Sequence, residues 1–324
     1  MMARIVSLGS ALQDIYLIDR DDLTSTAIGG EAIFGNILVG AKVDIDQLSY
    51  EVGGGGINSA ITFARHGHDA VFMGNIALDP AGDAIIQVTD REGINSSFIS
   101  FLKGKPTGTS IILLDTRTGE RTILTCRGAS EKFDNLRESD LELLMPDWLY
   151  VTTLRGDMGT LGRFFKKARE TRTKIMFNPG VKELAENKKL MALLEYVDVL
   201  LVNKSEAMQM VPGVLLEELL YHLNGYVPTV IITDGAMGGI AGNRKTKEVY
   251  RFGIYEDKKI KDATGAGDAF GSGFLAHFAS GKSFKRSLMF ASANSTSVIS
   301  KIGANRGILT GREELHPMPM QIIE

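Results

Sequence analysis

The residues best suited to chemistry lie in one short run, Asp262-Ala-Thr-Gly-Ala-Gly-Asp268, which leads directly into an amphipathic helical pattern over 269–279. The backbone amides of Gly265, Ala266 and Gly267 would stand at the start of that helix, where amides lack partners inside the helix. The helix dipole adds roughly half a positive charge at this end, and glycines let a bulky anion approach the backbone. The run therefore predicts an anion hole suited to a transferring phosphoryl group.

Asp268 ends this run and has two interpretations. An acidic residue in the first turn of a helix is ordinary capping chemistry. A carboxylate beside a phosphate cradle, however, repels the phosphate, so anion binding alone does not account for it. A general base that takes a proton from an attacking hydroxyl typically contributes about 10²–10⁴-fold in rate. The combination favours phosphoryl transfer to an alcohol, with Asp268 as the base.

The elements that must position these residues follow an alternating pattern of short β-branched runs and helical runs. This alternation is typical of a parallel sheet covered by helices, and we expect one α/β domain over 1–324. The expected strands are 4–8, 71–76, 148–152, 174–177, 197–202 and 230–233. The expected helices are 57–65, 81–92, 159–169, 215–223, 267–279 and 284–299.

Two regions break the alternation. The stretch 15–52 is long, contains glycine and is poorly helical, whereas 107–126 has two strand patterns, 110–115 and 121–126, around a Thr-Arg-Thr-Gly turn. The second region predicts an antiparallel hairpin. Such a hairpin is either a small sheet that covers a ligand cleft or an edge of the main sheet, and the pattern does not decide between them.

The run at 262–268 resembles the C-terminal signature of the ribokinase-like (PfkB) carbohydrate kinases. The resemblance continues along nearly the whole chain in the family's order. Gly9-Ser10 with Asp14 is similar to the first-strand motif, and the tetraglycine run 53–56 with Asn58 is similar to the N-terminal signature. The resemblance implies a three-layer α/β/α fold with a mostly parallel central sheet. It also implies a small β-sheet lid, formed by segments at approximately 15–52 and 105–127.

The same resemblance implies an ATP-dependent, Mg²⁺-requiring sugar kinase and assigns roles to individual residues. The implied substrate-binding residues are Asp14, Gly54, Gly55 and Asn58. The implied nucleotide-binding residues are Asn203, Glu206, Thr233, Gly235, Gly238, Thr264 and Asn305. Glu206 would act on Mg²⁺ mostly through water, because Mg²⁺ gives up its hydration reluctantly. Asp262 is the candidate ligand of a monovalent cation such as K⁺.

The weaker motifs also have plain structural interpretations. Asn203 and Glu206 fit a capping box, and Asp14 fits a turn at a strand end. Arg127 and Arg155 fall near predicted strand ends, where a cleft would lie. Solvation at the surface explains either arginine, and contact with a phosphorylated or acidic substrate is the sharper alternative.

The chain departs from the ribokinases at several positions. Leu12 stands where they carry Asn and Gly55 where they carry Lys, so D-ribose is disfavoured as the substrate. Asn305-Arg306-Gly307 stands where the family has a Ser that helps to coordinate K⁺, which leaves K⁺ activation open. A nucleoside kinase of the same fold is therefore the alternative, since a base favours apolar walls. A nucleotide- or sugar-binding regulator without catalysis is disfavoured, because a binder does not need Asp268.

Composition limits the remaining possibilities. The chain has 324 residues, a net charge of −3 and no long basic run, so nucleic acid and anionic membranes are not expected partners. Cys126 is the only cysteine, which excludes an internal disulfide. The sequence has neither a signal-peptide pattern nor a run of membrane-spanning length, so we expect a cytoplasmic location. The resemblance leaves homodimerisation through the lid open.

Overall fold

The computed structural model describes residues 2–19, 24–28, 31–34, 42, 44–45, 47–115 and 121–323. Within this range, the side chains of 19, 24–28, 31–34 and 115 are not described. The turn expected between 115 and 121 lies outside the described residues.

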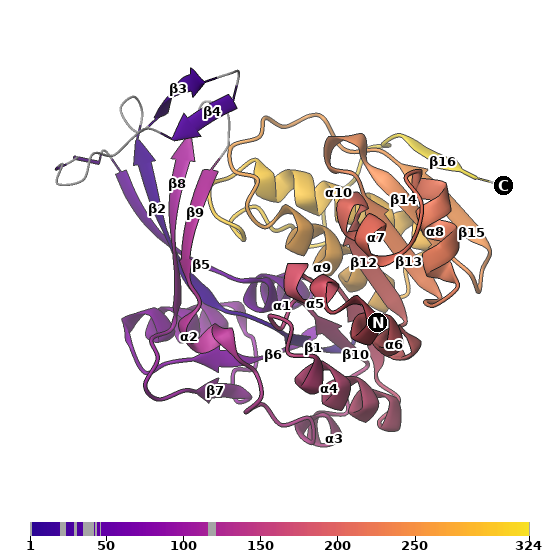
Figure 1. Cartoon of the computed structure of the whole chain (residues 1–324), viewed down its shortest axis with the longest axis horizontal. Helices are drawn as coiled ribbons and strands as arrows, with labels where there is room; N and C mark the ends of the chain where they lie inside the picture. Colours follow the sequence, from indigo (N-terminus) through magenta and orange to yellow (C-terminus); the bar gives the residue numbers. More distant parts are fainter. Residues whose placement is uncertain are drawn as a thin grey trace.

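The core of the molecule is a ten-stranded sheet with the order β16-β15-β14-β13-β12-β11-β10-β1-β6-β7 (Figure 1). Neighbouring strands from β13 to β7 pair in parallel, whereas the β13–β14, β14–β15 and β15–β16 pairs are antiparallel. The strands are β1 (Arg4–Leu8), β6 (Asp69–Ile76), β7 (Ile99–Phe101), β10 (Trp148–Val151), β11 (Lys174–Phe177), β12 (Val199–Asn203), β13 (Thr229–Thr233), β14 (Gly239–Asn243), β15 (Glu248–Phe252) and β16 (Met320–Ile322).

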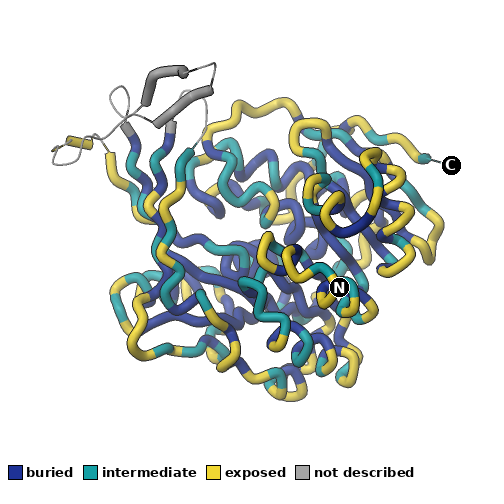
Figure 2. The backbone as a smooth tube through the Cα atoms, in the orientation of Figure 1, coloured by how far each residue is buried: buried dark blue, intermediate teal, exposed yellow. Residues whose placement is uncertain are grey.

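Successive residues of a strand point to opposite faces of the sheet, and here both faces are apolar. Helices therefore cover both faces. Ile5 packs in one apolar cluster and its neighbour Val6 in the other. The Ile5 side is covered by α1 (Gly55–Arg65), α2 (Pro80–Glu92), α9 (Ala266–Ala279) and α10 (Phe284–Ile299). The Val6 side is covered by α3 (Asp140–Leu144), α4 (Met158–Glu170), α5 (Val181–Ala185), α6 (Asn187–Leu193), α7 (Lys204–Met210) and α8 (Leu216–Asn224). Short 3-10 turns occur at η1 (Gly128–Glu131), η2 (Leu194–Tyr196) and η3 (Gly235–Met237). The arrangement is a three-layer α/β/α fold, with its most buried chain in the central strands (Figure 2).

A separate four-stranded sheet, called the small sheet below, rises from this body (Figure 1). Its strands lie in the order β5-β2-β8-β9, with β5 (Gln47–Gly53), β2 (Leu12–Asp19), β8 (Gly108–Asp115) and β9 (Arg121–Cys126). The β8–β9 hairpin therefore belongs to the small sheet and not to an edge of the main sheet. Two further strands, β3 (Thr24–Ile28) and β4 (Glu31–Phe34), pair only with each other among the described residues.

Most expected elements are present, with ends displaced by at most a few residues. The strands β1, β11 and β9 and the helix α10 have the expected bounds. The stretch 15–52 contains strands that the sequence analysis did not resolve, and the antiparallel strands β14 to β16 were also missed. No helix within the described part of the chain is both long and apolar enough to span a bilayer.

Candidate active site

The chemistry-bearing residues gather at the carboxyl edge of the parallel strands. Gly9 follows β1, Thr152 follows β10, and Asn203 and Thr233 are the last residues of the neighbouring strands β12 and β13, where they pair in register. Ligands of open α/β sheets bind at this edge, because the loops that leave it are free to shape a crevice. The strand order thus brings together residues that are far apart in the sequence.

The start of α9 has the backbone geometry of an anion site. Gly265 caps the helix in a left-handed conformation (φ 78°), which few residues other than glycine adopt. Within the described residues, the amides of Gly265, Ala266 and Gly267 donate no hydrogen bond. A side-chain atom added at Gly267 would meet nothing within 4 Å, so Gly267 is open to solvent, whereas Gly265 packs closely against Ala304.

Asp268 lies in the first turn of α9 and faces α1. Its Oδ2 accepts a hydrogen bond from Asn58 Nδ2 at 3.0 Å. The residue keeps part of its surface open, but its carboxyl group is enclosed by protein, and this burial raises its pKa above the ordinary 3.8. The hydrogen bond from Asn58 acts in the opposite direction, since it stabilises the ionised form. A carboxylate with a raised pKa is well suited to accept a proton.

The glycine run 53–56, where β5 ends and α1 begins, lies between Asp14 and Asp268 and is called the glycine floor below. A Cβ atom placed on Gly53 would collide with the carboxylate of Asp14, and one on Gly55 would lie 3.0 Å from Thr152 Oγ1 and 3.1 Å from Asp268 Oδ1. Asp14 is 5% exposed, and its burial raises its pKa to about 6. Asp14, Thr152 and Asp268 therefore border one glycine surface.

Asp262, which is fully buried, connects the anion site to its surroundings. Its Oδ1 accepts the amide of Thr264 at 2.9 Å, and its Oδ2 accepts the Tyr16 hydroxyl at 2.9 Å and the Gly303 amide at 3.1 Å. Arg121 Nε lies 3.8 Å from Oδ1. Tyr16 and Arg121 both come from the small sheet, so this sheet contacts the loop that leads into α9.

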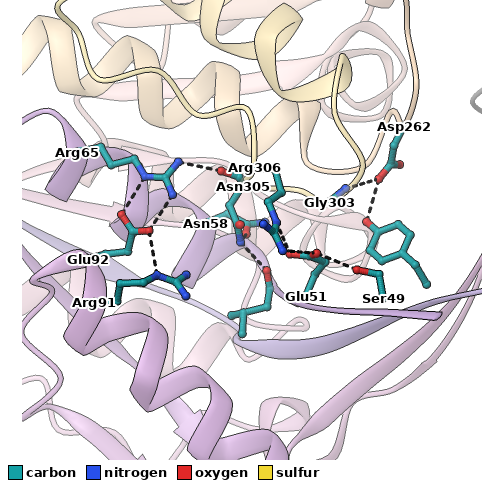
Figure 3. Close-up of polar contacts among 12 residues, drawn as sticks. Ser49, Glu51, Asn58, Arg65, Arg91, Glu92, Asp262, Gly303, Asn305 and Arg306 are labelled. Atoms are coloured by element: carbon teal, nitrogen blue, oxygen red, sulfur yellow. Dashed lines mark hydrogen bonds and ion pairs between the residues drawn. The ribbon is translucent and has the colours of Figure 1, made fainter. Parts of the chain in front are cut away.

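The loop after α10 also joins the small sheet (Figure 3). Asn305 is 8% exposed, and its Nδ2 donates to the Val52 carbonyl at 2.5 Å and, at 3.5 Å, to Asn58 Oδ1. Arg306 donates two hydrogen bonds of 2.8 Å to the Glu51 carboxylate, as Figure 3 shows. The Asn305 side chain thus lies between the end of β5 and Asn58 of α1.

The second group of expected residues surrounds the ends of β12 and β13. Asn203 and Glu206 form the capping box, because Asn203 Oδ1 accepts the Glu206 amide at 2.9 Å and Glu206 Oε2 accepts the Asn203 amide at 2.8 Å. Burial raises the pKa of Glu206. Gly235 and Gly238 both have positive φ, at 55° and 79°, in the turn between β13 and β14.

Comparison with known proteins identifies the family of this chain. The model of the pfkB family carbohydrate kinases matches residues 2–310. The chain belongs to the pfkB family of carbohydrate kinases. As a family member it is an ATP-dependent sugar kinase of the ribokinase type, with the three-layer fold described above.

Relatives of this pfkB-family kinase include two ribokinases. That of Haemophilus influenzae is 26% identical over 280 residues, covering 83% of this chain and 87% of the relative. That of Lactococcus lactis is 25% identical over 318 residues, covering 95% and 94%. Among solved structures, Arabidopsis thaliana ribokinase complexed with ribose and ATP has a TM-score of 0.77 at 20% identity, covering 95% and 96% of the two chains.

Sequence reasoning missed two residues that this pfkB-family kinase places at the site. Thr152 follows the apolar run 148–151 directly, so the rule that site residues follow parallel strands would have found it. Glu183 is buried and holds the loop after β10 through several hydrogen bonds. In the sequence Glu183 is an ordinary helix residue, and no local signal marks it.

Proposed function

We propose that this chain transfers the γ-phosphate of ATP to a hydroxyl of a sugar or sugar-like small molecule, with Asp268 as the general base. One observation carries the proposal: an enclosed carboxylate stands in the same helix turn as amides that have no acceptor. A base and an anion hole in the same helix turn suit an attacking hydroxyl and a transferring phosphoryl group. Backbone amides at 265–267 would hold the developing negative charge.

The acceptor would lie on the glycine floor. Gly54 and Gly55 leave room for it, Asn58 presents an amide, and Asp14 accepts hydrogen bonds from its hydroxyls. Ionised carboxylates make stronger hydrogen bonds to hydroxyls than neutral acceptors do. Asn58 also orients Asp268, so substrate binding and base placement share one side chain.

ATP would occupy the second group of residues, with Thr233, Gly235 and Gly238 along the nucleotide and Thr264 near its phosphates. Asn305, expected beside the nucleotide, contacts Val52 and Asn58 instead and would lie beside the acceptor. Bound Mg²⁺ neutralises phosphate charge, and Asn203 and Glu206 would hold it largely through water. No cluster of three or more metal-binding side chains occurs among the described residues. The single carboxylate of Glu206 and the amide of Asn203 fit Mg²⁺, which usually uses one or two carboxylates together with waters and substrate phosphates.

A monovalent cation fits Asp262 poorly. The groups around its carboxylate are two amides, a hydroxyl donor and a guanidinium, which occupy the places where a cation would need oxygen atoms. We therefore assign Asp262 to shaping the loop before α9 and propose no role for K⁺.

A nucleoside acceptor is the second candidate. Leu12 is 3% exposed beside Gly54, with its Cδ1 2.9 Å from the position of a Cβ on that glycine. An apolar wall at this point suits the base of a nucleoside better than a sugar hydroxyl. The small sheet would act as the lid over either acceptor.

The test is the variant Asp268→Asn, which keeps the size of the side chain and its ability to accept from Asn58. We expect kcat to fall at least about 10²-fold because the base is lost. Binding of ATP, measured by calorimetry, should stay within about twofold. Turnover is measured as ADP formation over a panel of sugars, sugar acids, sugar phosphates and nucleosides.

Asp90→Asn is the matched control, since Asp90 is an exposed carboxylate on α2. Its turnover should equal that of the unmodified enzyme. Near-normal kcat in Asp268→Asn would reject the assigned base, and an unmodified enzyme that consumes ATP with none of the panel would reject the kinase function.

A further inference from the structure

Two arginines near the acceptor end of the site lack hydrogen-bond acceptors. Arg127 follows β9 and Arg155 lies in the loop after β10, and both are partly buried. Within the described part of the chain, neither guanidinium donates a hydrogen bond, and Arg155 Nε is fully enclosed without a partner. Arg65, by contrast, donates to Glu92 and to two carbonyls. Buried donors without acceptors are rare in proteins, which indicates an acceptor that the chain itself does not supply.

The loop that carries Arg155 is rigidly built. Glu183, which is fully buried, accepts the amides of Leu154 and Gly156 at 2.8 Å and the hydroxyl of Thr153 at 2.7 Å. Arg155 itself has φ 62°, a conformation uncommon for residues other than glycine. Backbone strain of this kind persists where surrounding contacts enforce it, often at ligand-binding positions.

The positive charge of the pair is only partly balanced. Arg155 Nη2 lies 3.7 Å from Glu131 Oε2, too far for a hydrogen bond, while Lys182 Nζ lies 3.3 Å from the other oxygen of Glu131. Burial, and then the charge of Arg155, lowers the pKa of Arg127, which is also close enough to Asp14 to interact with its charge. Glu131 is therefore shared between two cations.

The pair lies on the Asp14 side of the glycine floor. Arg127 interacts with Asp14, which contacts Gly53, whereas Arg155 follows Thr152, which borders Gly55. An acceptor that presents its hydroxyl to Asp268 would have its opposite end near these guanidinium groups.

We propose that Arg127 and Arg155 bind an anionic group of the acceptor, so that the substrate is a sugar bearing a carboxylate or a phosphate ester. This inference rests on the proposed kinase function. A guanidinium is a planar fork that matches either oxyanion in a bidentate manner. Two such forks would stay without partners over a neutral sugar, and sites that leave buried polar groups unpaired discriminate strongly against the wrong substrate.

The experiment compares acceptors that differ only in charge: D-ribose, D-ribonate and D-ribose 5-phosphate, and the same set built on D-glucose. ADP formation gives kcat and KM for each acceptor at saturating Mg-ATP. We expect at least one anionic member to exceed its neutral parent in kcat/KM by at least about 10²-fold. The better of the two anions identifies a carboxylate or a phosphate ester as the natural group.

Variants then test the residues. Arg127→Gln and Arg155→Gln should each raise KM for the preferred anion about 10- to 100-fold and leave KM for ATP unchanged. Arg155→Lys keeps the charge without the fork and should give an intermediate KM. Arg137→Gln is the matched control, because the Arg137 side chain is 78% exposed and should not affect KM.

The outcomes separate the two proposals. Preference for a neutral parent, or an anion preference that survives both Gln substitutions in folded protein, overturns the anion site and leaves the kinase function standing. If no member of either set, neutral or anionic, supports ADP formation, the anion site is overturned, and the wider panel of acceptors described above decides the kinase function. Thermal melting of each variant shows whether a loss of affinity reflects unfolding.

Discussion

Asp14 is a site residue whose carboxyl group should change its charge near pH 6. Burial raises its pKa to about 6, with a smaller contribution from the charge of Asp262, and a hydrogen bond from Ser110 opposes the rise. Above pH 6 the ionised carboxylate accepts hydroxyl hydrogen bonds from the acceptor. Below it, Asp14 is protonated and these bonds weaken.

We therefore expect KM for the acceptor to increase as pH falls through about 6, while KM for ATP changes little. Initial rates between pH 5 and pH 8 measure both constants. Asp14→Asn should have a high acceptor KM at every pH, because its amide is always neutral. A wild-type KM that stays flat across this range would argue against Asp14 as a reader of the acceptor.

At the scale of single residues, the sequence predicted the site residues that have a local sequence signal. It missed the contacts that join residues far apart in the sequence. The run 262–268 combines the start of a helix with a carboxylate, which predicts an anion site and a base. The glycine run 53–56 marks Asn58 as a neighbouring site residue. The contact of Asn305 with Val52 joins positions 253 residues apart, and the hold of Glu183 on the Arg155 loop depends on two strands being neighbours. Spacing in the chain does not contain this information.

Among the elements, the small sheet is connected to the catalytic loop through polar groups. Tyr16 on β2 is fully buried and donates to Asp262, which in turn holds the amide of Thr264 before α9. Burial and the charge of Asp262 raise the pKa of Tyr16, so its hydroxyl remains a donor at neutral pH. A movement of the small sheet would therefore disturb the loop that leads to the anion site.

Tyr16→Phe should lower the free energy of unfolding by about 1–3 kcal/mol, because a buried carboxylate loses one of its donors. It should also lower kcat more than it raises KM for ATP. Urea denaturation and steady-state rates test the two expectations. Tyr50→Phe on the neighbouring strand β5 is the control, since the Tyr50 side chain is 60% exposed and should tolerate the change. An unaltered kcat in Tyr16→Phe would show that the loop does not depend on the small sheet.

Helices and strands were predictable where a single hydrophobic period dominates the segment. The parallel strands are short apolar runs and α10 has a clear helical period, so their bounds agree closely with the expectation. The small-sheet strand β5 has one partly polar face and β14 contains two glycines, Gly239 and Gly242, so neither shows a strong period. Their pairing depends on the rest of the fold.

For the whole molecule, a cluster of partly buried histidines should set the lower pH limit of stability. His66 ends α1 and His277 lies in the last turn of α9, where its ring stacks on Phe290 at 3.9 Å between centroids. Burial is the main cause that lowers the pKa of His66 to about 4 and that of His277 to about 3. His68, Lys282 and Arg286 act in the same direction on His277, whereas Glu313 opposes the shift at His66.

Unfolded histidine takes up its proton near pH 6.5, and the folded cluster does so only near pH 4 or below. Stability from these residues is thus complete above pH 6.5 and is lost as pH falls from there toward 4. Between pH 6.5 and pH 5 we expect a loss of about 1–2 kcal/mol per histidine. The raised pKa values of Asp14, Asp268 and Glu206 act in the opposite direction, so variants are needed to isolate the cluster.

His277→Phe keeps a ring against Phe290 and removes one titrating group. Its melting temperature should fall less between pH 7 and pH 5 than that of the unmodified protein. His222→Gln, at an exposed position on α8, should keep the original pH dependence. Equal pH dependence in His277→Phe and the unmodified protein would exclude His277 as a source of the acid sensitivity.

The glycine floor restricts how new specificities could arise in this lineage. A methyl group at position 53 would displace the Asp14 carboxylate, so a step toward a new acceptor at this place would damage acceptor binding first. Leu12, Arg127 and Arg155 border the floor without forming it, and exchanges there leave the reacting groups intact. Adaptation to other acceptors should therefore proceed through the walls of the pocket, while position 53 stays a glycine.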